Sequence, residues 1–451
     1  MKLGAFLKAR WQHSRNIRRS RAEIDALQLK KFRRLVAYAN EHSPYYRELI
    51  AARGINVDDC VPTHFPPITK QEVVDNFDRI VTDRRITSEG VNHFLRTSTD
   101  PTERFLGEFT VVHTAGITGR MVAFFTYSPA EWAVGAALAL RIWPFSWRRR
   151  RMAYFGLTRG HFSGSSHIAS SRRLLARLRF VTLACDVNDP IAPTIEQLNA
   201  FQPNTLSGYS PVIGWLAEAQ EAGRLNISPE YVAVGGQPLT KENRQLIERA
   251  FGATILNHYG SSEHLTMGIG RASYGGTYLF EDELIFEPDG DQSFVTNLFN
   301  YTQPLIRYVM DDRLEILDDP NPVFPFTKIR DLGGRPRPDP VFTNQYGEDD
   351  RVSSATFVEF FVPNVQQTQL EALDKNSCVF RVRLKVGLSD PEQREALAAA
   401  EKWLTDLFVT KEMENVSRRI EEVEHFGGRK FQLIVTPETA TDSTPFEQRP
   451  Q

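Results

Sequence analysis

Two short segments of this 451-residue chain combine residue types that suit a charged ligand. The first, Thr114–Arg120, lies between the apolar runs 109–112 and 121–125, so we predict a loop between two strands. Glycines let backbone N–H groups approach an anion, while hydroxyls and a guanidinium add donors suited to phosphate oxygens. The candidate donors are Thr114, Gly116, Thr118, Gly119 and Arg120. A plain hairpin turn is the alternative, because the segment lacks the Gly-Lys-Ser/Thr ending of a Walker loop.

The second segment, Tyr259–Glu263, follows a predicted strand that ends at Leu256. A carboxylate in such a position can hold Mg²⁺, which prefers oxygen ligands and bridges nucleotide phosphates. Glu263 is the candidate magnesium ligand, and the hydroxyls of Ser261 and Ser262 offer further contacts. A turn whose glutamate faces water is the alternative interpretation of the same residues.

Several polar side chains near these two segments are candidates for lining a substrate pocket. Tyr209 ends one predicted strand, and His258 directly precedes Tyr259. His113 precedes the first segment, and a Gly-Ser-Ser-His loop occupies residues 164–167. Each of these residues can equally be structural, at a strand end or in a connection, so the sequence leaves both interpretations open.

The elements that position these residues alternate between strand and helix in the central third of the chain. The predicted order is a strand over 204–208, a helix over 211–222, a strand over 231–234, a helix capped by Thr240 that ends at Phe251, and a strand over 253–256. Such βαβαβ units give parallel strands, and their ligands collect at the carboxyl ends of those strands. The segments after Val234 and Leu256 are therefore expected at one edge of a sheet.

The whole chain is predicted to be an α/β protein with more than one domain, because 451 residues exceed what one hydrophobic core fills. We expect a large N-terminal domain with parallel βαβ sheets and a small antiparallel β lobe, followed by a small α+β C-terminal domain. The predicted boundaries are 1–332 for the large domain with a helical segment over 1–95, 333–338 for a Gly/Pro/Arg-rich linker, 339–436 for the small domain and 437–451 for a disordered tail. The strands predicted for the lobe are 278–280, 284–287, 293–298 and 313–317.

Composition narrows the function classes. Hydrophobic residues make up 41% and charged residues 24%, as in an ordinary globular protein, and the formal net charge is −2. A protein that wraps nucleic acid needs a basic excess, so we expect no nucleic-acid partner. Three scattered cysteines suggest neither a disulfide framework nor a zinc site, and no run is long enough for a membrane span. We therefore expect a cytoplasmic protein.

The basic residues of the N-terminal segment form one local exception to this balance. The first 22 residues contain seven Lys and Arg residues and no acidic residue, which first appears at Glu23. A solvated helix face is the preferred interpretation, and an anionic partner is the alternative. The basic run 148–151 is interpreted in the same way, as the end of a helix before a strand.

The order of motifs resembles the adenylate-forming (acyl-activating) superfamily, and within it the phenylacetate-coenzyme A ligase and coenzyme F390 synthetase-like branch. The resemblance covers most of the chain. It rests on Ser43-Pro44-Tyr45-Tyr46, Pro67-Ile68-Thr69-Lys70, Ser207-Gly208-Tyr209-Ser210, Gly235-Gly236-Gln237-Pro238-Leu239, Tyr259-Gly260-Ser261-Ser262-Glu263, Pro304-Leu305-Ile306-Arg307-Tyr308 and Asp312. These segments occur in the order that the branch shows.

The resemblance implies a role for each matching residue. ATP would be held by Thr114, Gly116, Thr118, Gly119, Gly236, Gln237, Pro238, Tyr259, Gly260, Ser261, Ser262, Asp312 and Arg335. Within this set Tyr259 would stack near the purine and Asp312 would accept bonds from the ribose hydroxyls. Glu263 would bind Mg²⁺, and Lys430 and Arg120 would stabilise charge on the reacting groups. Tyr209 and His258 would line the acyl pocket. The small domain would be mobile and would pivot at the 333–338 linker.

The activity that the resemblance implies is ATP-dependent activation of a small, aromatic carboxylic acid to an acyl-adenylate, followed by transfer to coenzyme A. The implied cofactors and partners are ATP, Mg²⁺, coenzyme A or another thiol or amine acceptor, and the acid; a homodimer is compatible with the sequence. Ala115 and Ile117 stand where the family has hydroxyl residues. This departure keeps two alternatives open: an amide ligase or carrier-protein loader, and a degenerate homologue that binds a ligand without turnover.

Overall fold

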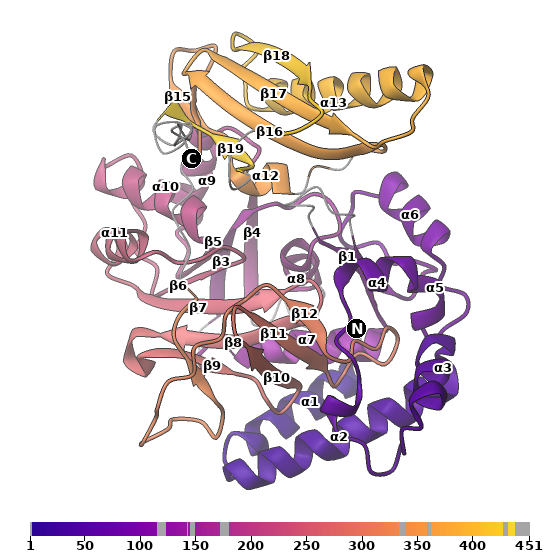
Figure 1. The fold of residues 1–451 in the computed structure, drawn as a ribbon. Coiled ribbons are helices and arrows are strands. Elements are labelled where there is room, and N and C mark those ends of the chain that lie inside the picture. Colours follow the sequence, from indigo (N-terminus) through magenta and orange to yellow (C-terminus); the bar gives the residue numbers. More distant parts are fainter. Residues whose placement is uncertain are drawn as a thin grey trace, which may run out of the picture. The chain divides into compact units, whose positions relative to one another are not determined.

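The computed structural model describes residues 2–114, 123–141, 143–144, 149–171, 180–332, 339–358, 360, 362–426 and 432–437. These residues form two compact units (Figure 1). The large unit comprises Met1–His113, Ala123–Ala184 and Phe201–Gly334, and the small unit comprises Thr114–Val122, Cys185–Ala200 and Arg335–Gln451.

Six helices open the large unit, within its described residues. They are α1 (Leu3–Asn16), α2 (Arg21–His42), α3 (Pro44–Arg53), α4 (Lys70–Asp75), α5 (Phe77–Ile80) and α6 (Ser88–Thr97). Local sequence sets their ends: Ser20 and Glu23 form a capping box at α2, and Ser43 caps α3 with Pro44 in its first turn. Thr69 and Glu72 form a second capping box, at α4. The helical character predicted for the N-terminal segment is therefore correct.

An eight-stranded mixed sheet forms the centre of the large unit. Its strand order is β13-β9-β8-β7-β6-β5-β3-β4. The strands are β3 (Arg150–Gly156), β4 (Phe180–Asp186), β5 (Thr205–Tyr209), β6 (Tyr231–Gly235), β7 (Thr254–Ser261), β8 (Leu265–Arg271), β9 (Gly276–Leu279) and β13 (Lys328–Ile329). Strands β3, β5, β6 and β7 pair in parallel, whereas β7, β8 and β9 pair antiparallel. The predicted parallel unit is thus part of a larger mixed sheet.

Two crossover helices confirm the predicted βαβαβ pattern. Helix α10 (Ser210–Glu221) connects β5 to β6, and α11 (Lys241–Phe251) connects β6 to β7 (Figure 1). Thr240 caps α11 by accepting a hydrogen bond from the Asn243 N–H, and Gly252 ends the helix in a left-handed conformation. The carboxyl ends of β5, β6 and β7 therefore share one edge of the sheet, as the sequence predicts.

The antiparallel lobe is smaller than predicted. Strands β10 (Leu284–Asp289), β11 (Gln292–Asn297) and β12 (Tyr308–Met310) form a separate three-stranded sheet. The strand predicted over 278–280 instead belongs to the large sheet as β9. The strand predicted over 313–317 is wrong: only an isolated bridge joins Ile316 to Ile329, because the Asp/Pro-rich residues 318–322 interrupt extended pairing.

The remaining elements of the large unit flank this sheet. They are β1 (Thr110–His113), β2 (Phe124–Tyr127), α7 (Pro129–Arg141) and α8 (Ser163–Ser171). Strands β1 and β2 pair antiparallel, which confirms the two strands predicted around the first glycine-bearing segment. A buried core that includes Phe32, Trp132, Leu256 and Phe280 joins the N-terminal helices to the sheet.

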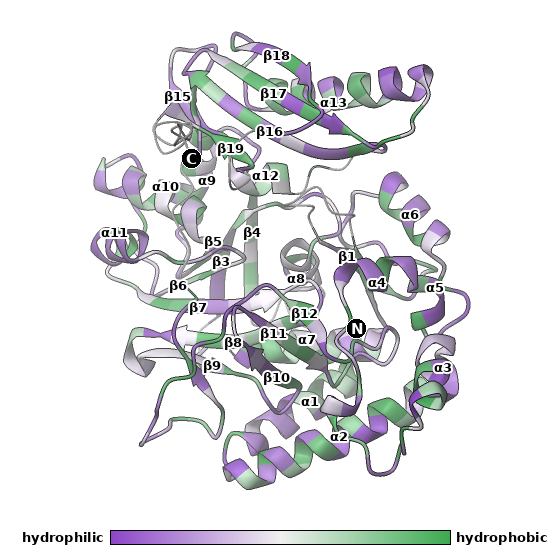
Figure 2. Cartoon of the chain, viewed as in Figure 1, coloured by the Kyte–Doolittle hydropathy of each residue, from purple (hydrophilic) through white to green (hydrophobic). Residues whose placement is uncertain are grey.

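The small unit is an α+β structure with its own core. Its elements are α9 (Ile191–Phe201, up to Ala200), β14 (Val341–Thr343), β15 (Asp349–Arg351), α12 (Ser354–Val358), β16 (Val365–Asp374), β17 (Ser377–Leu384), α13 (Asp390–Thr410), β18 (Ser417–Glu422) and β19 (Ile434–Val435). Hydrophobic and hydrophilic residues alternate along the end of β17 (Figure 2), as expected for a strand with one buried face. Phe342, Phe380 and Phe408 lie in that core.

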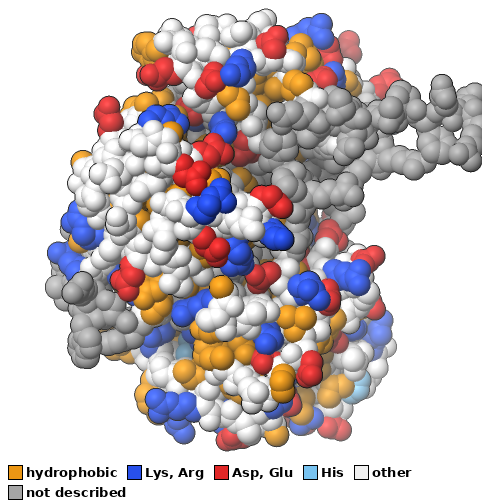
Figure 3. All heavy atoms as spheres, turned by 90° about the vertical axis from the view of Figure 1, so that its left-hand side faces the viewer, with side chains coloured by type: hydrophobic (Ala, Val, Ile, Leu, Met, Phe, Trp, Pro, Cys, Tyr) orange, Lys and Arg blue, Asp and Glu red, His pale blue; other side chains and the backbone are white. Residues whose placement is uncertain are grey.

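Surface charge agrees with the nearly neutral composition. On the face drawn in Figure 3, Lys and Arg side chains lie interspersed with Asp and Glu side chains. Among the described residues, no helix is both long enough and apolar enough to cross a membrane.

Candidate functional site

Strand β7 carries the Tyr259–Glu263 segment further into the sheet than the sequence predicts. The strand continues to Ser261 instead of ending at Leu256, and its pairing with β8 shifts register between Tyr259 and Gly260. A Cβ added at Gly260 would lie 2.5 Å from the Leu265 carbonyl oxygen, so only glycine fits there. The segment is thus a strand end, with the turn at residues 262–264, and its backbone is tightly constrained.

The Tyr259 side chain is bonded to the carboxylate predicted to hold the ribose. Its hydroxyl donates to Asp312 Oδ2 over 2.9 Å. Burial raises the pKa of Asp312, and the bond from Tyr259 opposes that shift because it favours the charged form. Burial, together with the negative charge of Asp312, raises the pKa of Tyr259, so the phenol stays protonated and remains a donor. The structure therefore brings these two predicted site residues together.

Glu263 is a buried carboxylate that faces hydroxyl groups. Its side chain is 8% exposed, and its Oε1 accepts a hydrogen bond from the Tyr308 hydroxyl over 3.2 Å. In the part of the chain that the structure describes, no Lys, Arg or His lies within ion-pair distance of Glu263. A buried negative charge without a cation is costly, which favours a bound cation there. One carboxylate oxygen with nearby hydroxyls is a donor set that fits Mg²⁺, which keeps waters and phosphates as its other ligands.

The turn that contains Glu263 is fixed to the end of β1. The Ser262 hydroxyl donates to the His113 carbonyl over 3.1 Å, and the Tyr127 hydroxyl donates to the Glu263 carbonyl over 2.8 Å. Thr114 follows His113 directly in the chain. The Tyr259–Glu263 segment therefore contacts the residue that precedes the first segment. The first segment's further candidates Gly116, Thr118, Gly119 and Arg120 lie outside the described residues, as do Arg335 and Lys430.

Two glycines at the end of β6 make room for two aromatic side chains. A Cβ added at Gly236, which has φ +71°, would lie 2.9 Å from the Tyr209 ring. A Cβ at Gly235 would lie 3.0 Å from His258 Nδ1. Gln237 and Pro238 follow in the connection to α11. Tyr209 at the end of β5, the predicted ATP-binding residues after β6 and His258 on β7 therefore lie on three adjacent strands or directly after them.

Two neutral histidines lie near this edge. Burial lowers the pKa of His258 to about 4, and its Nε2 lies 3.2 Å from the Thr266 hydroxyl. Burial, followed by the effect of nearby His258, lowers the pKa of His167 to about 3. The His167 ring stacks on Trp132 at 4.4 Å, and among the described residues its buried Nε2 has no hydrogen-bond partner.

Three residues of this region were missed by sequence reasoning. Tyr308 was recognised only as part of a motif and not as the partner of Glu263, while Trp132 and Tyr127 were not singled out. Tyr308 lies 45 residues from Glu263 in the chain. A lone tyrosine or tryptophan in an apolar stretch carries no signal that separates a site residue from a core residue.

A second cluster of ligand-type side chains lies elsewhere in the large unit. Atoms of His13, Asp282 and Glu283 lie within 4.8 Å of one another, a geometry compatible with a metal. Cations already occupy this cluster: Arg141 makes two hydrogen bonds to Asp282, of 2.8 and 2.7 Å, and Lys31 lies 2.7 Å from Glu283. We therefore interpret it as a structural ion-pair network.

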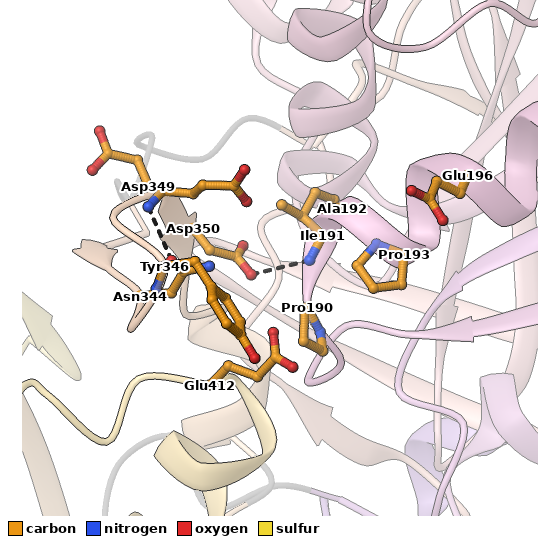
Figure 4. A pocket seen from close by; sticks show the side chains of 11 residues that line it. Pro190, Ile191, Ala192, Pro193, Glu196, Asn344, Tyr346, Asp349, Asp350 and Glu412 are labelled. Atoms are coloured by element: carbon orange, nitrogen blue, oxygen red, sulfur yellow. Dashed lines mark hydrogen bonds between the residues drawn. The ribbon is translucent and has the colours of Figure 1, made fainter.

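A hollow of about 280 Å³ lies within the small unit (Figure 4). Its acidic side chains include Asp350, which accepts from the Ile191 N–H over 3.0 Å and from Lys411, and Asp349, which accepts from Lys375. Among the described residues, the lining of this hollow includes no predicted site residue. Because these two carboxylates already have partners, we assign no chemistry to this hollow.

Comparisons with known proteins agree with the motif order. No family model matches the chain. Protein CapK of Staphylococcus aureus is 23% identical over 342 residues, which is 69% of this chain and 68% of that protein. Phenylacetate-coenzyme A ligase of Aromatoleum evansii is 23% identical over 66% of this chain and 68% of its own length. Indoleacetate–lysine synthetase of Pseudomonas savastanoi is 32% identical over a shorter stretch, 26% of this chain and 31% of that protein.

The fold itself matches a solved acyl-coenzyme A ligase. The crystal structure of 2-hydroxyisobutyryl-CoA ligase, in complex with its acyl-AMP and CoA in the thioesterification state, superposes with a TM-score of 0.59. The match covers 92% of this chain and 90% of that chain at 19% identity. At this identity the likeness establishes the fold, a large α/β unit followed by a small α+β unit.

Proposed function

Because this chain belongs to the adenylate-forming superfamily, we propose that it activates a carboxylic acid with ATP and passes the acyl group to a thiol or an amine. The observation that carries the proposal is Glu263, a buried carboxylate that accepts a hydrogen bond from the Tyr308 hydroxyl and whose turn is bonded to the end of β1. The hydrogen bond from the Ser262 hydroxyl to the His113 carbonyl supports this proposal, because His113 directly precedes the candidate phosphate loop in the chain.

The proposed reaction has two steps. In the first, a carboxylate oxygen of the acid attacks the α-phosphorus of ATP, the bond to the bridging oxygen breaks, and pyrophosphate leaves. In the second, a thiol or amine attacks the acyl carbon of the resulting mixed anhydride, loses its proton, and AMP leaves. Neither step requires a covalent bond to the protein, so the residues act by positioning and by stabilising charge.

Described residues supply part of this positioning. We propose that Asp312, held by Tyr259, accepts hydrogen bonds from the ribose, and that the Gly236–Pro238 segment contacts the base. Glu263, with one oxygen bonded to Tyr308, would hold Mg²⁺, which neutralises phosphate charge when bound. Lys430, Arg120 and Arg335 keep the roles that the resemblance implies.

The acid that fits best is small and aromatic. Tyr209 ends β5 and His258 lies on β7, and the glycines at the end of β6 between these strands leave room for both rings. An aromatic ring suits such surroundings through stacking. We propose coenzyme A as the acceptor in a cytoplasmic reaction, with the 333–338 segment as the pivot between the two steps. The similarity to phenylacetate-coenzyme A ligase and to 2-hydroxyisobutyryl-CoA ligase supports coenzyme A as the acceptor.

An amide product is the second candidate. The stretch of 122 residues that is 32% identical to indoleacetate–lysine synthetase supports an amine acceptor such as an amino acid. Both candidates share the first step and differ only in the group that opens the mixed anhydride.

Mass spectrometry of the products separates the two candidates. The full chain is incubated with ATP, Mg²⁺ and a panel of aromatic acids, with coenzyme A, lysine or neither. An acyl-coenzyme A product supports the thiol acceptor, and an acyl-lysine product supports the amine. Absence of AMP formation with every acid and either acceptor would contradict the proposed function.

A further inference from the structure

Helix α1 presents two different faces. One face is buried in the large unit, where Ala9, His13 and Asn16 lie, and His13 and Asn16 bond to Glu283 and Asp282. The opposite face carries large apolar side chains in water: Leu3 is 47% exposed, Leu7 57% and Trp11 59%. These three residues are spaced four apart, so they form one stripe along the helix. Scattered exposed apolar residues are ordinary, whereas an aligned stripe on one helix indicates a contact surface.

Basic side chains flank the stripe. Lys8 and Arg15 are exposed, Arg10 is half-buried, and Arg18 follows the helix. The Arg15 guanidinium lies over the Trp11 ring at 4.7 Å. Among the described residues, these four cations make no ion pair, whereas Arg19 and Arg21 pair with Glu23 and Asp25. The charge around the stripe is therefore available to an anionic surface.

We propose that this stripe, Leu3, Leu7 and Trp11 with Lys8, Arg10, Arg15 and Arg18, docks the protein on an anionic lipid bilayer. A helix that lies in a membrane interface needs apolar side chains on one face and Lys or Arg beside them, with tryptophan at the headgroup level. Both parts are present on the exposed side of α1. A nucleic acid would use the cations and leave the apolar stripe in water, and a second copy of this chain would bring the same cations together.

This inference goes beyond acid activation and does not depend on it. Its physical consequence is a soluble catalyst held at a membrane surface, close to acids or acceptors that partition into lipid. Because each basic residue near an anionic bilayer adds attraction that salt screens, binding should weaken as ionic strength rises.

Sedimentation with lipid vesicles tests the proposal on the full chain. The probes are vesicles of phosphatidylserine and phosphatidylcholine in equal parts, and vesicles of phosphatidylcholine alone. We expect the partition coefficient to be at least about tenfold higher on the anionic vesicles, and to fall with added salt. Equal binding to both vesicle types, or binding to neither, would overturn the proposal.

Two variants and a matched control identify the surface. The double variant Leu7→Gln with Trp11→Gln removes the stripe, and Lys8→Gln with Arg15→Gln removes flanking charge; each should lower binding about tenfold. The control, Leu373→Gln with Val386→Gln, changes exposed apolar residues of the small unit, which are 48% and 97% exposed. It should bind as the wild type does. All three should keep the wild-type circular dichroism, because the changed side chains are in water.

Two other outcomes would point to a different occupant. A dimer in light scattering that the Leu7→Gln, Trp11→Gln variant dissolves, together with no vesicle binding, would assign the stripe to a second copy and overturn the proposal. Binding to DNA that survives loss of the stripe, without vesicle binding, would do the same.

Discussion

Two buried carboxylate clusters in the large unit differ in what faces them. Asp282 is 0% exposed and is held by both nitrogens of the Arg141 fork, while Lys31 faces Glu283. Glu263 is nearly as buried, yet tyrosine and serine hydroxyls surround its turn and no cation of the described residues pairs with it. Arg141 and Lys31 neutralise the first cluster. Among the described residues, no cation neutralises Glu263, and we propose that a bound ligand does so.

This difference separates structure from function more clearly than residue type does. The His13, Asp282 and Glu283 group has the ligand atoms of a metal site. Because cations already pair with its carboxylates, we interpret it as an ion-pair network that holds α1, α7 and the start of β10 together. Glu263 has fewer ligand-type neighbours, and its turn contacts His113, the residue before the candidate phosphate loop. We therefore propose that a missing counter-charge among the described residues, and not the number of acids, distinguishes the candidate site from the structural cluster.

The largest expected effect is on stability, at the paired cluster. Replacing Arg141 with methionine leaves Asp282 buried without its main partner, which should lower the free energy of unfolding by about 3–5 kcal/mol. Denaturant unfolding measures this. The control is Glu315→Gln in the exposed pair with Arg330, which should change stability by less than about 1 kcal/mol. Equal effects at both pairs would contradict the structural role of the Asp282 network.

The next effect is on catalysis, at the unpaired cluster. Glu263→Gln keeps the shape of the side chain and removes its charge, so adenylate formation should fall roughly 10²–10³-fold. Stability should stay level or rise, because no cation of the described residues pairs with the charge that is removed. Acyl-AMP formation and denaturant unfolding are measured on the same preparation. If Glu263→Gln lost much stability but kept the wild-type turnover, Glu263 would be the structural carboxylate and the comparison would be wrong. Lys430→Ala should likewise reduce adenylate formation sharply and leave the fold intact.

A pH-dependent effect follows from the neutral histidines. The folded pKa of His167 is about 3 and that of the unfolded histidine is 6.5, so below pH 6.5 the unfolded chain binds the extra proton. Stability should therefore fall as pH decreases from 6.5 toward 3, by up to about 1.4 kcal/mol per pH unit for this residue. His167→Phe preserves the stack on Trp132 and should make the slope of unfolding free energy against pH shallower by that amount. An unchanged slope would show that His167 is not buried in its neutral form.

The smallest effect concerns the ribose carboxylate. Tyr259→Phe removes one hydrogen bond to Asp312, worth about 1 kcal/mol, so the KM for ATP should rise about fivefold. The kcat should change less than the KM, because the bond positions a binding residue. Steady-state kinetics at saturating acid measures both. A fall in kcat at constant KM would indicate that Tyr259 acts on the reacting groups instead.

Much of this architecture could be predicted from local signals. Helix ends are specified by hydrogen bonds within a few residues. Thr240 begins the helix whose apolar face follows it, and Ser43-Pro44 separates two helices. The parallel strand order follows from alternation of strands and helices. The position of Tyr259–Glu263 at a strand end follows from the same alternation, although β7 extends to Ser261 because its pairing with β8 continues.

Contacts between distant segments could not be predicted in this way. Glu263 meets Tyr308, and Ser262 meets the carbonyl of His113, which precedes it by 149 residues. Nothing in a single sequence pairs a given tyrosine with a given glutamate. The strand predicted over 313–317 failed for a more local reason, because the Asp/Pro-rich residues that follow it interrupt its pairing beyond the bridge between Ile316 and Ile329.

The exchange of labelled pyrophosphate into ATP tests the central claim most directly. The account predicts exchange that requires both an acid from the panel and Mg²⁺ in the wild type, and that falls at least roughly 100-fold in Glu263→Gln. The exchange reaction requires no acceptor, so the measurement isolates the first step. Wild-type protein that shows no acid-dependent exchange with any acid, or a Glu263→Gln variant that exchanges at the wild-type rate, would contradict it.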